Sequence, residues 1–373
     1  MAVMSAAMSE LRVRIPKVTA AGAATVAGSG AGALALTWVL YERVLPFSGV
    51  LGFWISWYVV FLLLYTTMAM LQWDRREAVN RLTSVLFGTG GAVAVAIVVI
   101  TVAYALVKGW TAVHHLSFLT QSMEYASPLS PLSAGGVLGA MVGSLEQLGL
   151  AAVFSVPLGL TGALFLASDV GGRLARPVRT IVEAMTALPD LVAGLFIFSL
   201  FILSLHFLFC GILAALAISV TMMPIIVRSA EVVIRLVPGT LREASYALGG
   251  SQWRTAWNVL LPTARSGLVT ATVLAMARGI GETAPVLLTA GFTKDLNLNP
   301  FSGPQINLPL YIWNYVHIEG EAPADFARGF GAAFVLVVVV LILFTTARVL
   351  GGSAPGQLSR RQRRRLRRSA VRP

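Results

Sequence analysis

An arginine and a glutamate four residues apart, Arg278 and Glu282, lie inside the long apolar stretch 263–291. At about 1.5 Å per helical residue, Arg278 lies roughly 20 Å from the start of that stretch, near the middle of a bilayer. A charge at that depth costs at least about 2.5–3.5 kcal/mol on insertion scales, so it needs a partner or a polar surrounding. The spacing of four places both side chains on one helix face, where they can pair.

Two interpretations of this pair follow from the residue types. A guanidinium binds oxyanions because its forked donors match the oxygens of phosphate or sulfate, and the glutamate would then hold or release it. Alternatively, the pair is structural and fixes helix packing. Gly279, Gly281 and Pro285 loosen the helix around it. The spacing alone separates neither these interpretations nor phosphate from sulfate.

The composition places the chain among all-α, multi-pass membrane proteins. Of its 373 residues, 57% are hydrophobic and 12% are charged, and the mean hydropathy is +0.79. A soluble chain carries about 25% charged residues, and here the charges fall between long apolar runs. The single cysteine, Cys210, cannot form an internal disulfide, and the histidines show no metal-ligand spacing. The sequence shows neither a nucleophile–base set nor paired carboxylates, so an enzyme is not indicated.

Eight apolar runs are long enough to span a bilayer. If the N-terminus is cytoplasmic, most lysines and arginines between the runs also fall on the cytoplasmic side, as the positive-inside rule requires. Both termini are then cytoplasmic, and the arginine-rich segment 360–372 lies against anionic lipid; its lack of aromatic residues argues against nucleic-acid binding. An alternative for the first run is a cleaved signal peptide. The runs are 21–41, 49–71, 84–107, 136–167, 181–205, 210–227, 263–291 and 326–349.

The segment 240–262 lies between two of these runs and predicts short helices. Thr240 and Glu243 fit a capping box, so a helix should begin there. Gly249 should divide it in two, and Pro262 should end it. Small residues on its surface would allow a partner to approach closely, but an interfacial amphipathic linker has the same composition.

The sequence Glu243-Ala244-Ser245, followed by Gly249 and by Val259-x-Leu261-Pro262, resembles the EAA signature of bacterial ABC importer permeases. Serine stands for the second alanine and valine for isoleucine. The resemblance implies that this segment docks on a separate ATPase subunit and transmits its motion. Its coupling residues would be Glu243, Ala244, Ser245, Gly249 and Pro262. The sequence contains no Walker A motif, so ATP and Mg²⁺ would be bound by that partner and not by this chain.

The stretch Ala277-Arg278-x-x-Gly281-Glu282-Thr283-Ala284-Pro285 is similar to the phosphate importer permeases of the PstA type. That resemblance extends over about residues 137–350 and implies that Arg278, Glu282 and Arg228 contribute to the anion path. Arg228 is equally well explained as an arginine that anchors the end of its span at the membrane surface. Asp190 departs from the family, which has a small neutral residue there. Because a carboxylate near an anion path repels the substrate, we expect Asp190 to pair with Arg228 or Arg278.

The resemblance implies a type I ABC importer permease core of about six transmembrane helices at residues 83–350. An N-terminal extension with two further spans, 1–82, would precede this core, and a basic cytoplasmic tail, 351–373, would follow it. The sequence assigns no role to the extension or to Glu146.

The function implied is the permease subunit of an ATP-driven phosphate importer in the bacterial cytoplasmic membrane. Its partners would be a homologous permease (PstC-like), an ATPase dimer (PstB-like) and an extracytoplasmic phosphate-binding protein (PstS-like), together with lipid and inorganic phosphate, and no nucleic acid. A sulfate or molybdate permease, a passive anion channel and a membrane regulator of phosphate signalling remain as alternatives.

Overall fold

The computed structural model describes the chain except for residues 1–19, 45–48, 128–129, 168, 319–321 and 352–373. Within the described ranges the secondary structure is helical, without strands. Seven of these helices are long and apolar enough to cross a membrane, or up to eight if one bent pair forms a single span. The expected all-α, multi-pass fold is therefore confirmed, whereas the basic tail lies outside the described residues.

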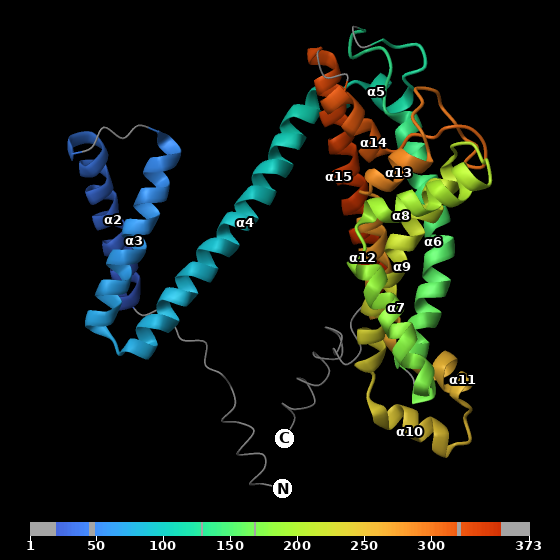
Figure 1. Ribbon diagram of the computed structural model, residues 1–373, viewed down its shortest axis with the longest axis horizontal. Helices are drawn as coiled ribbons and strands as arrows, with labels where there is room; N and C mark the ends of the chain where they lie inside the picture. Colours follow the sequence, from blue (N-terminus) through green and yellow to red (C-terminus); the bar gives the residue numbers. More distant parts are fainter. Residues whose placement is uncertain (1–19, 45–48, 128–129, 168, 319–321, 352–373) are drawn as a thin grey trace, which may run out of the picture. The chain divides into compact units, whose positions relative to one another are not determined.

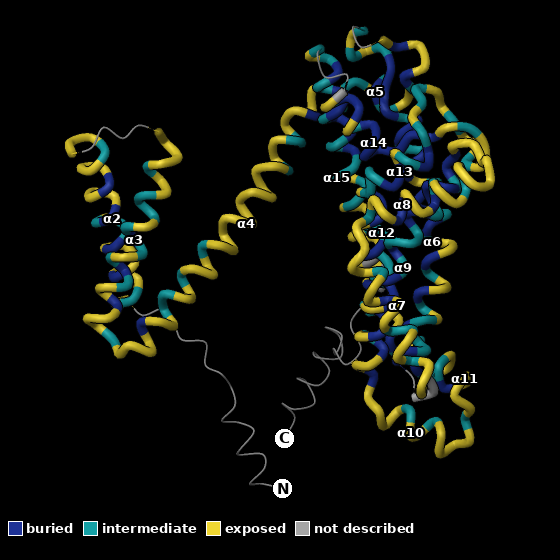
Figure 2. The backbone as a smooth tube through the Cα atoms, viewed as in Figure 1, coloured by how far each residue is buried: buried dark blue, intermediate teal, exposed yellow. Residues whose placement is uncertain are grey.

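The chain divides into two compact units, Met1–Ile100 and Thr101–Pro373. In the first unit, helix α2 (Ala20–Val39) and its π-helical end Leu40–Val44 form a hairpin with α3 (Val50–Gln72) (Figure 1). Trp57 donates its indole N–H to the carbonyl of Gly30 at 3.1 Å. Because the two helices share only a small apolar core, most of their large apolar residues are exposed (Figure 2).

Helix α4 (Arg75–Val113) is longer than the predicted run 84–107 and passes from the first unit into the second. Its apolar centre is exposed along its length, as Figure 2 shows. Val93, Ile97 and Ile100 are among the exposed residues. An exposed surface of this composition is suited to contact with lipid.

The second unit is built around α6 (Leu138–Ala167) and α9 (Gly211–Arg235), which pack along their length (Figure 1). Small residues allow this close approach: a Cβ placed on Gly159 would lie 2.7 Å from Ile226 Cγ2. Helices α12 (Leu261–Gly279) and α15 (Pro323–Gly351) complete the bundle. Shorter elements at its ends are α5 (Leu116–Thr120), η2 (Asp169–Leu174), α14 (Leu308–Trp313) and η5 (Asn314–Ile318).

Two predicted spans are wrong as continuous helices. The run 181–205 is divided into α7 (Ala175–Ala187) and α8 (Asp190–Ile197), which continues as η3 (Phe198–Ser204), and the two parts are bent by 102°. The residue before Pro189 is held in an extended conformation, which ends α7. The run 263–291 is likewise divided, because α12 ends at Gly279 and α13 (Ala284–Thr289) begins after a short break.

The segment 240–262 forms α10 (Gly239–Ala247), α11 (Gln252–Thr255) and η4 (Ala256–Leu260). The predicted break at Gly249 is confirmed by its φ of +78°. The capping box is wrong: α10 begins one residue earlier, so Thr240 is helical and the N-cap is Pro238 without a side-chain hydrogen bond. The predicted stop at Pro262 is also wrong, since this proline lies in the first turn of α12 and the helical stretch continues through it from Gln252 to Gly279.

Candidate functional site

Arg278 and Asp190 form an ion pair between the two broken helices. Arg278 lies in the last turn of α12, and Asp190 is the first residue of α8. The Arg278 Nη2 donates to Asp190 Oδ2 at 2.9 Å and to Oδ1 at 3.3 Å. Of the two partners expected for Asp190, Arg278 is the one that it contacts. Both residues reach the same place because each lies where a membrane-length run is interrupted.

Glu282 is a more distant neighbour of the same guanidinium. Its Oε1 lies 3.7 Å from Arg278 Nε, so the predicted pairing is present, but the distance is longer than that to Asp190. Two carboxylates therefore flank one arginine. The Arg278 side chain remains 56% exposed, whereas that of Glu282 is 12% exposed. An arginine with that much free surface can accept a further oxyanion, provided that a carboxylate moves or is replaced.

Close packing of α8 on α13 holds the two breaks together. A Cβ on Gly194 of α8 would lie only 2.6 Å from the Cα of Pro285 in α13, so only glycine fits in this arrangement. The backbone N–H of Cys210 also donates to the carbonyl of Thr289 at 3.3 Å. These contacts bring the start of α8 and the break 280–283 to one side of α9.

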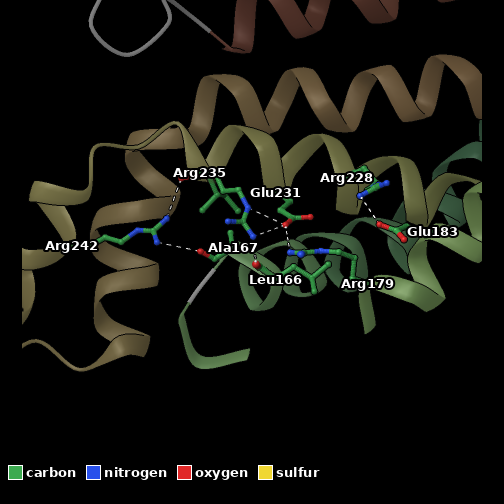
Figure 3. A network of polar contacts seen from close by, with 9 residues as sticks. Leu166, Ala167, Arg179, Glu183, Arg228, Glu231, Arg235 and Arg242 are labelled. Atoms are coloured by element: carbon green, nitrogen blue, oxygen red, sulfur yellow. Dashed lines mark hydrogen bonds and ion pairs between the residues drawn. The ribbon is translucent and has the colours of Figure 1, made fainter. Parts of the chain in front are cut away.

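Arg228 does not join this pair. Its Nη1 lies 3.4 Å from Glu183 Oε1 on α7, and both side chains are about half exposed. It is therefore placed on the face of α9 that contacts α7, as Figure 3 shows. Its contribution to the anion path stays a prediction.

The EAA residues lie mostly on the surface of α10 and the following turn. Glu243, Ala244, Gly249 and Pro262 are exposed, and the half-buried Ser245 exchanges a hydrogen bond of 2.8 Å with Thr255. That bond ties α10 to α11. Large apolar side chains on the same segment are also exposed, among them Leu248, Trp253 and Trp257. A short helix with exposed small and apolar residues has the surface that a docking partner requires.

Glu146, to which the sequence assigned no role, belongs to a polar contact between α6 and the segment before α14. Gln305 Nε2 donates to Glu146 Oε2 at 2.6 Å, and Gln147 Nε2 donates to the Gln305 carbonyl at 3.0 Å. Ser144 accepts from the backbone N–H of Leu308 at 2.7 Å. These bonds fix the long loop between α13 and α14 on α6.

A second charged cluster, missed by the sequence reasoning, lies at the end of the bundle that carries α10 (Figure 3). The nearly buried Glu231 of α9 accepts from Arg179 of α7 at 3.0 Å and from Arg235 at 2.8 Å. Arg235 also donates to the carbonyl of Leu166, and Arg242 of α10 donates to that of Ala167. The sequence could have indicated this cluster, because Glu231 and Arg235 are four residues apart at the end of an apolar run.

Two further observations limit the chemistry of the chain. Among the residues with described positions, no three histidine, cysteine or carboxylate side chains are grouped to hold a metal ion. Arg328 is fully buried, and its Nη1 lies 2.9 Å from Asp325 Oδ1. A buried pair of this kind indicates a structural role.

Residues 156–351 match the family described as the binding-protein-dependent transport system inner membrane component. The chain belongs to this family. Phosphate transport system permease protein PstA 1 of Mycobacterium tuberculosis (strain ATCC 25618 / H37Rv) is 38% identical over 276 residues, which cover 74% of this chain and 88% of that protein. Within the family the chain is thus a PstA-type permease.

A further relative has a more general name. The probable ABC transporter permease protein YqgI of Bacillus subtilis (strain 168) is 33% identical, over 74% of this chain and 96% of its own length. Among solved structures, a chain of the MetNI methionine ABC transporter, in inward-facing conformations, gives a TM-score of 0.46 at 19% identity. The match covers 64% of this permease and 95% of that chain, and it is too weak to add to the assignment.

Proposed function

We propose that this permease is the transmembrane subunit of an ATP-driven importer of inorganic phosphate. The relatives named as phosphate transport permeases support the substrate class. The observation that carries the proposal is the half-exposed Arg278, which lies between two interrupted helices and is held by a carboxylate that an oxyanion can replace. Interrupted helices at mid-membrane are a common way to build a transport site.

In this mechanism, Arg278 offers its forked N–H donors to the phosphate oxygens. Asp190 and Glu282 compensate the positive charge of the guanidinium when no anion is bound. Alternating access then requires the bundle to change which side of the membrane the site faces. The exposed α10 and α11 receive the motion of a separate ATPase, through Glu243, Ala244, Ser245, Gly249 and Pro262.

We further propose the following assembly. An ATPase dimer (PstB-like) drives transport, and one of its subunits docks on α10. A homologous permease (PstC-like) supplies the other half of the path, and a phosphate-binding protein (PstS-like) delivers substrate from outside. Both termini then face the cytoplasm. Residues 83–350 form the permease core, 1–82 an extension and 351–373 a basic tail. The chain itself hydrolyses no ATP in this assembly.

The decisive experiment measures ATP-dependent uptake of labelled phosphate by the reconstituted complex, with and without excess sulfate. Arg278→Gln should abolish uptake at equal accumulation of the complex. Arg265→Gln is the matched control, because Arg265 is an exposed arginine on the same helix α12. Its uptake should stay within about twofold of the parent, since a surface charge contributes little.

Each alternative has its own outcome. Full competition by sulfate would assign another oxyanion to the same fold. Phosphate movement without an ATPase would indicate a channel. Normal uptake by Arg278→Gln would make the pair structural, and a parent complex that senses but does not transport phosphate would be a regulator.

A further inference from the structure

Helix α7 connects the α10 end of the bundle with Asp190. Its last turn is followed directly by Leu188, Pro189 and Asp190, so that the first residue of α8 is only three positions beyond α7. At about 1.5 Å per residue, the 13 residues of α7 span about 20 Å. One helix therefore extends from the Glu231 cluster to the partner of Arg278.

Two charge pairs fix the register of α7 on α9. In one pair α7 supplies the arginine, and in the other it supplies the glutamate. Arg179 contacts Glu231 at 3.0 Å, and Glu183, one turn further, contacts Arg228 at 3.4 Å (Figure 3). A slide of α7 by one turn would bring Glu183 against Glu231, or Arg179 against Arg228. Like charges in contact are unfavourable, so the two pairs oppose such a slide.

An apolar contact beneath these charges adds to the link. Val182 of α7 is buried against Leu166 of α6 and Val227 of α9. The Arg179–Glu231 pair is the stronger of the two charge pairs, because the Glu231 side chain is 8% exposed whereas that of Glu183 is 50% exposed. A charge pair shielded from water is less screened than an exposed one. Helix α7 is thus held most firmly at Glu231.

The same glutamate is joined to the coupling segment. Glu231 orients Arg235, which donates to the Leu166 carbonyl at 2.8 Å. Arg242 of α10 donates to the Ala167 carbonyl at 3.2 Å and to the Ile234 carbonyl at 3.4 Å. Cations at the last carbonyls of α6 are favoured by the helix dipole. The end of α6, the end of α9 and the start of α10 therefore form one connected body.

We propose that α7 is a lever that carries motion of the coupling helix α10 to Asp190, with the Arg179–Glu231 pair as its attachment point. When the connected body moves, α7 follows it, and the chain bends at Leu188–Pro189, where α7 and α8 meet at 102°. Asp190 then shifts relative to Arg278, which exposes or covers the guanidinium. Arg179 and Glu231 are positioning residues in this scheme. The role of Arg278 rests on the proposed function, whereas the movement of α7 does not.

The test uses the whole reconstituted complex with its ATPase subunits. Spin labels on α7 and η3, at Ala184→Cys and Leu203→Cys in a Cys210→Ala background, report the bend between the two helices. Distances are compared without nucleotide and with ATP plus vanadate. We expect the distance distribution to change in the parent, and Arg179→Gln to abolish that change while ATPase subunits still copurify and hydrolysis stays above about half.

Arg176→Gln is the matched control. Arg176 is exposed on the same helix, one turn before Arg179, and forms no ion pair within the part of the chain that the structure describes. It should keep the full nucleotide-dependent change. If Arg179→Gln does not assemble, Arg179→Lys replaces it; a single ammonium should give roughly half of the parent's change.

Three results would contradict the proposal that α7 is a lever. The first is a spin-label distance in the parent that nucleotide does not change. The others are a full nucleotide-dependent change in Arg179→Gln or Arg179→Lys, or a loss of that change in Arg176→Gln as large as in Arg179→Gln. Loss of the ATPase subunits from Arg179→Gln at normal permease levels would assign the pair to docking instead. These readouts need no phosphate, so a parent that bends but transports no phosphate contradicts the substrate proposal alone.

Discussion

Two arginine–aspartate pairs in the second unit have the same contact distance and opposite surroundings. Arg328 Nη1 lies 2.9 Å from Asp325 Oδ1, and Arg278 Nη2 lies 2.9 Å from Asp190 Oδ2. Arg328 and Asp325 have no exposed surface, whereas the side chains of Arg278 and Asp190 are 56% and 32% exposed. Equal distances therefore describe two different kinds of site.

The hydrogen-bond partners explain the difference. The Nη2 of Arg328 donates to three backbone carbonyls, at 2.8 to 3.1 Å, so this arginine fastens the loop after α5 to α15. Those carbonyls belong to Ser130, Pro131 and Ala134. Arg278 instead contacts two carboxylates that come from interrupted helices. A buried arginine with fixed partners stabilises one conformation, and an accessible one can exchange its partner for a ligand.

The largest effect is expected at the buried pair. Arg328→Met would remove the bonds that Arg328 donates to Asp325 and to the three carbonyls, and it should destabilise the fold by about 3–5 kcal/mol. The unfolding midpoint of the purified complex in detergent measures this loss. Arg348→Met, an exposed position on the same helix α15, is the control and should be near neutral. A near-neutral Arg328→Met would show that the buried pair contributes no more to stability than the exposed one.

The second effect concerns the packing that brings Asp190 to Arg278. Gly194→Ala would force α8 away from Pro285 and should lower phosphate uptake about tenfold, the equivalent of about 1.4 kcal/mol. Gly149→Ala on α6 meets no atom within 4 Å and is the control. Initial rates of uptake at equal permease levels decide between them. Unchanged uptake in Gly194→Ala would separate α8 packing from transport.

Asp190→Ser removes the carboxylate that competes with phosphate for the guanidinium. It also introduces the small neutral residue that the PstA-type permeases have at this position. The freed Arg278 should bind anion more tightly, so that the KM for phosphate falls about 3- to 10-fold, or up to about 1.4 kcal/mol. Uptake measured over a range of phosphate concentrations gives this value. If uptake kinetics and accumulation both match the parent, Asp190 does not control the arginine.

The smallest effect is expected on the stability of Arg278→Met. Because the pair is substantially exposed, its loss should change the unfolding free energy by less than about 1 kcal/mol. The same detergent unfolding experiment as for Arg328→Met provides the measurement. A loss comparable with that of Arg328→Met would mean that both pairs are structural.

Local features of the fold were predictable from the sequence because they depend on neighbouring residues. The membrane class follows from apolar runs, and the position of the break at Gly249 follows from a backbone conformation that glycine adopts easily. The spacing of Arg278 and Glu282 predicted their proximity, which the structure confirms at 3.7 Å. The motifs around Glu243 and Arg278 are also sufficient to indicate the family.

Other features were decided only by tertiary structure. Asp190 and Arg278 are 88 positions apart, and Arg179 and Glu231 are 52 apart, so no local pattern joins them. The runs 181–205 and 263–291 appeared continuous because hydropathy is the same on both sides of a break, while the backbone before Pro189 and after Gly279 is not helical throughout. Hydropathy determined which segments lie in the membrane; the packing of interrupted helices determined which charges meet there.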